Sequence, residues 1–79
     1  MLKLAEDEIK ITANKIVSLT LYNAEKENCL DNAYFLAYEI LDLAQWMCEN
    51  YSINHFVIKE ILKCDTISDK TKQIIRKLS

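Results

Sequence analysis

Apolar and small side chains recur along the chain at intervals of three and four residues, in four separate segments. This interval follows the turn of an α-helix and marks a buried side. It predicts helices over about residues 4–27, 31–50, 54–64 and 68–78. No segment alternates apolar and polar residues between turn signals, so we expect no strand. The sequence therefore predicts one all-α domain over residues 1–79, a small four-helix bundle-like fold with short connections and no sheet.

Polar residues at the segment boundaries supply helix-start signals. Asn28 and Asp31 stand before the second predicted helix, and either side chain could cap it. Thr66 and Ser68 stand before the fourth, and Thr66 with Asp69 has the spacing of a capping box. We expect the second helix to begin near Asn28 or Asp31 and the fourth near Ser68.

The second predicted helix carries apolar residues on both of its sides. At 100° per residue, one wide arc is apolar enough to face a core by itself. Its members are Ala33, Leu36, Ala37, Ile40, Leu41, Leu43, Ala44, Met47 and Cys48. The opposite side holds an acidic and aromatic stripe, whose members follow one another at steps of four, three, four and three residues. The stripe consists of Phe35, Glu39, Asp42, Trp46 and Glu49, with Tyr38 at its edge.

Two interpretations of this stripe remain open. In the first, the second helix is central and packed on both sides, so that Phe35 and Trp46 are covered within the monomer. In the second, another chain covers the stripe, because aromatic residues ringed by charges are typical of an interface core with a polar rim. Ile11 and Tyr22, opposite the buried side of the first helix, form a secondary apolar patch of the same kind.

The chain contains no glycine and no proline. Phosphate-binding loops, dinucleotide-binding turns, nucleophile elbows and EF-hand loops all need glycine at fixed places. Because those motifs are absent, most motif-bearing enzyme classes have no support here. Any function is therefore expected to lie on the helix surfaces.

Charge is nearly balanced, with ten basic and twelve acidic side chains and a formal net charge of −2. Its distribution is uneven, because residues 32–58 carry three acids and no base, whereas residues 59–79 carry six bases and three acids. The segment over residues 58–78 also has the outline of two helices joined by a turn, as in a helix-turn-helix. An alternative function is therefore nucleic-acid binding through Lys70, Lys72, Arg76 and Lys77.

The sequence offers little for catalysis or metal binding. Cys29, Cys48 and Cys64 have no paired spacing, and His55 is the single histidine, so neither a zinc site nor a disulfide framework is indicated. Carboxylates at Glu39 and Asp42 are explained by an exposed helix face. We expect no catalytic residue, no metal and no cofactor, and predict that the protein is not an enzyme.

Taken together, the pattern predicts a small protein–protein interaction module, acting as an adaptor, regulator or inhibitor. Self-association through helix faces, as a homodimer, is the simplest way to cover the stripe. The acidic start of the chain lacks the features of a signal peptide, and no apolar run could span a membrane, so a cytoplasmic location without membrane contact is expected.

Overall fold

The structure is a computed structural model that describes the backbone of residues 6–47 and 51–79 and the side chains of residues 7–47 and 55–79. It contains four helices and, within these residues, no strand: α1 (Glu6–Lys26), α2 (Ala33–Met47), α3 (Tyr51–Ile61) and α4 (Asp69–Leu78). The all-α, bundle-like prediction is confirmed.

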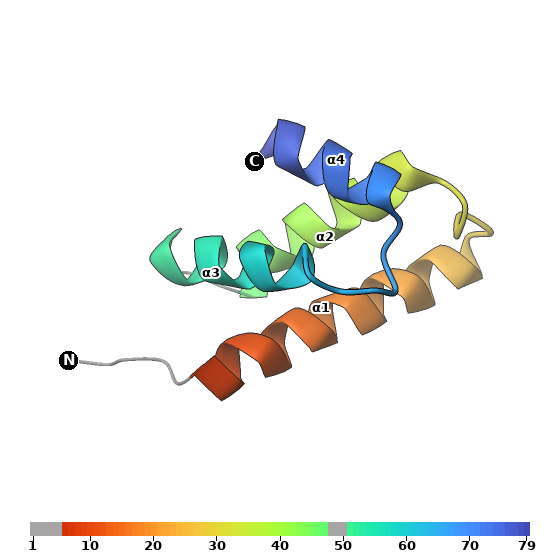
Figure 1. Ribbon diagram of the computed structural model, residues 1–79. Coiled ribbons are helices and arrows are strands. Elements are labelled where there is room, and N and C mark those ends of the chain that lie inside the picture. Colours follow the sequence, from red (N-terminus) through yellow and green to blue (C-terminus); the bar gives the residue numbers. More distant parts are fainter. Residues whose placement is uncertain (1–5, 48–50) are drawn as a thin grey trace.

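The helices are arranged around α1 and α2, which run in opposite directions along one another (Figure 1). The third helix packs on α1 and also touches α2, whereas α4 packs on α2 alone. Within the described chain, the backbones of α3 and α4 do not approach each other closely. The bundle is therefore open on one side of α2, between α3 and α4.

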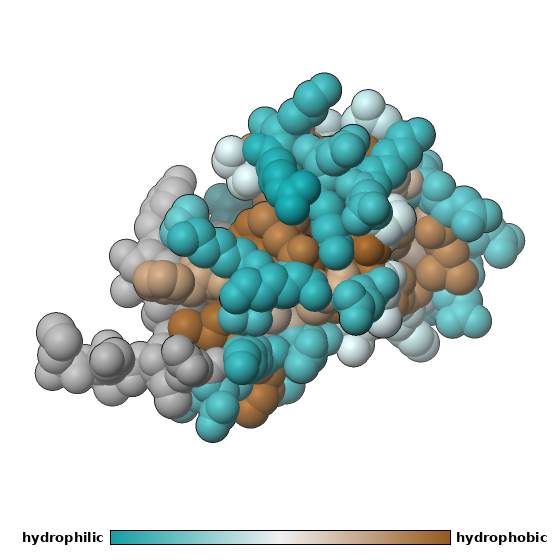
Figure 2. Space-filling view, in the orientation of Figure 1, coloured by the Kyte–Doolittle hydropathy of each residue, from teal (hydrophilic) through white to brown (hydrophobic). Residues whose placement is uncertain are grey.

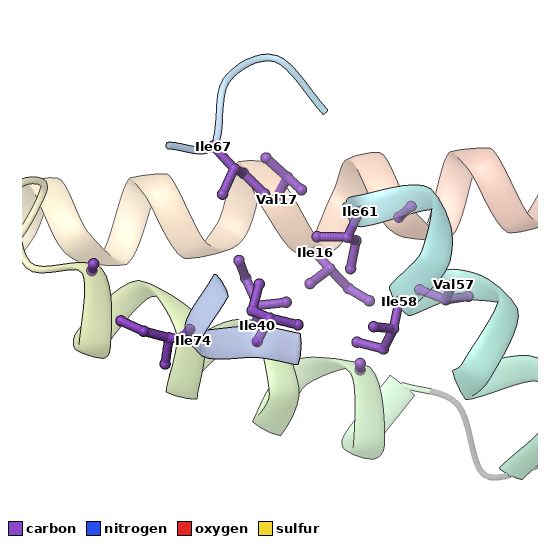
Figure 3. Close-up of a cluster of buried hydrophobic side chains, with 13 residues drawn as sticks. Ile16, Val17, Ile40, Val57, Ile58, Ile61, Ile67 and Ile74 are labelled. Carbon is purple, nitrogen blue, oxygen red and sulfur yellow. The ribbon is translucent and has the colours of Figure 1, made fainter. Parts of the chain in front are cut away.

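The core is aliphatic. Its largest fully buried hydrophobic side chains come from all four helices: Ile16, Ile40, Val57, Ile61 and Ile75. Figure 3 shows Ile16, Ile40, Ile61 and their neighbours pointing toward one another between α1, α2 and α3. Buried Ile67, in the connection to α4, lies beside Val17 and holds that connection against α1 (Figure 3).

The turn between α1 and α2 contains no glycine and relies on two asparagines, Asn28 at the end of α1 and Asn32 at the start of α2. Asn28 takes the left-handed conformation, with φ of 56°, which asparagine adopts more readily than most residues. The Cys29 N–H donates to the Ala24 carbonyl at 2.7 Å, and the Asn28 N–H donates to the Glu25 carbonyl at 3.2 Å. These two bonds form the Schellman motif that closes a helix.

Asn32 caps the start of α2, since its Oδ1 accepts a hydrogen bond from the Phe35 N–H at 3.0 Å. The expectation that Asn28 or Asp31 caps this helix is therefore wrong. Asn28 instead belongs to the motif that ends α1. The chain reverses direction over the residues that follow, and α2 begins only at Ala33.

Ser68 caps α4, as predicted, by accepting from the Thr71 N–H at 3.2 Å. The expected capping box of Thr66 and Asp69 is wrong, because Ser68 and not Thr66 is the N-cap. The Ser68 hydroxyl also shares a hydrogen bond of 2.9 Å with the Thr71 hydroxyl. Thr71 is buried, so this cap anchors the first turn of α4 against the core.

Candidate protein-interaction surface

The two sides of α2 differ sharply in burial. The inward side is fully or almost fully buried and consists mainly of small residues: Ala33, Leu36, Ala37, Ile40 and Ala44. On the outward side Trp46 is 80% exposed, and Tyr34 and Tyr38 are exposed as well. The interpretation in which α2 is packed on both sides is therefore wrong for Trp46. The neighbouring helices pack on the alanine-rich side, where their backbones can approach closely, and leave the indole outside.

The predicted acidic and aromatic stripe is assembled on this outward side. Asp42 and Trp46 are exposed, whereas Phe35 and Glu39 are half-buried. Glu39 is held at the seam between the first two helices, because the Asn23 Nδ2 donates to its Oε2 at 3.3 Å. Glu49, the last predicted member of the stripe, lies outside the described residues.

A shallow depression of about 580 Å³ lies beside the indole of Trp46. It is lined by Glu39, Asp42, Leu43, Gln45 and Trp46. Three of the predicted stripe residues, Glu39, Asp42 and Trp46, therefore border one concave surface, whose charged side chains within the described ranges are both acidic.

Ile11 and Tyr22 are both exposed on α1, as the helical spacing predicts. Neither of them lines the depression beside Trp46. The Lys26 Nζ lies 5.4 Å from the centre of the Tyr22 ring, so that ring already has a cation–π partner one turn along its own helix. The structure thus leaves the secondary patch separate from the depression.

The four basic residues proposed for nucleic-acid binding all lie on α4. Lys70, Arg76 and Lys77 are exposed and Lys72 is half-buried. However, residues 62–68 join α3 to α4, and this connection is longer than the three or four residues usual in a helix-turn-helix. The two helices also do not pack on each other. This geometry lends no support to the helix-turn-helix analogy, and nucleic-acid binding stays an untested prediction.

A second concave surface was not predicted from the sequence. It is a groove of about 550 Å³ between α3 and α4 over α2, lined chiefly by Leu41, Gln45, Ile58, Lys59, Leu62 and Leu78. Figure 2 shows apolar surface exposed in this region, below the hydrophilic outer side of α4. Leu41 lies at the edge of the apolar arc that the sequence assigns to the core, so only the arrangement of α3 and α4 over α2 reveals that it borders a groove.

The two described thiols, Cys29 and Cys64, are both unpaired and half-buried. Burial raises the pKa of the Cys64 thiol, Lys72 opposes this shift, and Glu60 and Asp65 add to it. A raised pKa disfavours the thiolate that a nucleophile requires. Among the described side chains, no three His, Cys, Asp or Glu residues are grouped to hold a metal ion. None of the helices in the described ranges is long and apolar enough to cross a membrane.

Comparison of the chain with protein families, curated proteins and solved structures gives no match.

Proposed function

We propose that this protein is a non-enzymatic protein–protein interaction module, an adaptor, regulator or inhibitor, that associates with itself through the outward side of α2. Trp46, Tyr38 and Phe35 are its apolar anchors, and Glu39, Asp42 and Glu49 form the charged rim. Ile11 and Tyr22 provide a secondary contact.

The observation that carries this proposal is the exposure of Trp46, which is 80% accessible to solvent. A large aromatic side chain can bury about 150–250 Å² in a contact, and such side chains dominate the energetics of interfaces. Among the described residues, no aromatic side chain is fully buried, and Tyr34, Tyr38 and Trp46 are each more than half exposed. Tryptophan and tyrosine surrounded by charges are the composition of an interface centre and its rim.

Free thiols fit a reducing, cytoplasmic setting for this role. Cys29 and Cys64 are both unpaired and half-buried, and small proteins of oxidising compartments usually use cysteines in disulfides. We therefore propose that the protein associates in a reducing compartment, without a disulfide between the chains.

Sedimentation velocity over a wide range of protein concentration tests the proposal. Wild-type protein is expected to form a reversible dimer. Trp46→Ala should weaken the association by about 2 kcal/mol or more, the loss typical of a central aromatic anchor. Circular dichroism of each variant establishes that its fold is retained.

Phe56→Ala is the matched control, because Phe56 is also an exposed aromatic residue but lines neither concave surface. It should leave the association unchanged. A wild-type protein that stays monomeric at every concentration would overturn self-association, and an equal loss in both variants would show that the contact is not specific to the outward side of α2.

A further inference from the structure

The groove between α3 and α4 has the size and the apolar lining of a binding site for a large side chain. Its apolar lining comes from all three helices that border it: Leu41 from α2, Ile58 and Leu62 near the end of α3, and Leu78 from α4. Its volume of about 550 Å³ lies within the range of small-molecule pockets, which is ample for an aromatic side chain. The backbones of α3 and α4 do not approach each other closely, and the groove lies at the surface between them.

The charges of the groove and of the depression beside Trp46 are opposite in sign. Among the described side chains that line the groove, Lys59 carries a charge and none is acidic. Among the described side chains that line the depression, Glu39 and Asp42 are acidic and none is basic. Surfaces of opposite charge attract each other, whereas contact between two surfaces of the same charge is disfavoured.

The two surfaces are also neighbours on the same helix. Gln45 lines both of them, and Trp46 follows it directly. In a two-fold symmetric pair, residue i of one chain contacts residue j of the other and the reverse contact forms at the same time. With the symmetry axis near Gln45, two copies can each offer Trp46 to the groove of the other.

We infer that the groove binds a second copy of this chain, whose Trp46 inserts between α3 and α4 while its Asp42 lies over Lys59. This inference rests on the proposed self-association and specifies its geometry: two identical contacts, closed at the dimer. A pairing of Trp46 with Trp46 would instead place the acidic residues of both copies against one another.

The groove is tested first by Leu78→Asp. Leu78 ends α4 and is 46% exposed, so the substitution spares the core, but it places an acid at the mouth of the groove. Self-association should weaken by roughly tenfold or more, since each dimer contains the altered contact twice. Leu30→Asp is the matched control, because Leu30 is 48% exposed and lines neither surface. It should associate like the wild type.

Mixing two weakened variants tests the reciprocal geometry. Trp46→Ala keeps an intact groove, and Leu78→Asp keeps an intact Trp46, so a mixed pair retains one complete contact whereas neither variant alone retains any. Sedimentation velocity of the mixture is expected to show more dimer than either variant alone. No gain on mixing would overturn insertion of Trp46 into the groove.

A charge exchange tests the contact between Asp42 and Lys59. Lys59→Glu should weaken association a few-fold, and adding Asp42→Lys to the same chain should restore it. Lys63→Glu is the control of equal charge, because Lys63 pairs with Glu60 at 3.4 Å on α3 and does not line the groove. It should have no effect on association.

The possible failures are distinguishable. If Trp46→Ala weakens the dimer while Leu78→Asp does not, the groove inference is wrong and the proposed function stands. If species larger than a dimer accumulate with concentration, the contacts form an open chain and the closed two-fold arrangement is wrong. If the wild type never associates, the proposed self-association has already failed.

Discussion

Neighbouring residues on α2 illustrate the contrast between its two sides. Ala37 is completely buried, whereas Tyr38, the next residue, is more than half exposed. A core usually takes its large side chains inward, but here the inward side of α2 is mostly alanine and the outward side carries tyrosine, phenylalanine and tryptophan. The difference indicates that the inward side is shaped for close packing of helices, and it is the basis of the proposed contact through the outward side.

The largest expected effect lies on the inward side, at Ile40. This side chain is almost fully buried at the centre of the core. Ile40→Ala should lower the free energy of unfolding by about 2–5 kcal/mol, through lost apolar burial and the cavity left behind. Chemical denaturation followed by circular dichroism measures the change.

Ile40→Val is the graded control and should cost only about 0.5–1.5 kcal/mol. A small loss in both variants would mean that Ile40 does not pack as tightly as its burial indicates.

The next effect separates the two adjacent positions directly. Ala37→Leu should destabilise the fold by about 1–3 kcal/mol, because the added side chain has no room between closely packed helices. Tyr38→Leu should change the stability by no more than about 0.5 kcal/mol, since its side chain is largely in solvent. The same denaturation experiment checks both. Tolerance of leucine at position 37 would contradict close packing on the inward side.

The smallest expected effect on stability is that of Trp46→Ala. Measured at concentrations where the protein is monomeric, the free energy of unfolding should change by no more than about 0.5 kcal/mol. The indole fluorescence of the wild-type monomer should be that of a solvent-exposed tryptophan. A loss of about 3 kcal/mol or more, as for a buried tryptophan, would contradict the outward placement.

Helical periodicity predicted the fold and both sides of α2 well. The positions of Ala33, Ala37, Ile40 and Ala44 on one side and of Trp46 on the other follow from 100° per residue alone. Burial of Phe35 and Trp46 within the monomer could not be decided in this way, because it depends on whether a further helix covers the stripe.

Two features could not be predicted from the sequence, for different reasons: the turn between α1 and α2, and the groove. Asparagine suits both a helix start and a left-handed helix end, so Asn28 was assigned the wrong role. The groove depends on the spacing of α3 and α4 over α2, which is set by packing and by the anchoring of Ile67, and no local pattern encodes it.

The position of the aromatic residues on a hydrogen-bonded helix, rather than on a loop, has a consequence for the entropy of binding. The backbone beneath Tyr38 and Trp46 is ordered when the protein folds, so a partner has only side-chain torsions left to restrict. Tryptophan and tyrosine have just two such torsions each. The surface is thus preorganised, and more of the energy gained on burying these rings remains available as affinity.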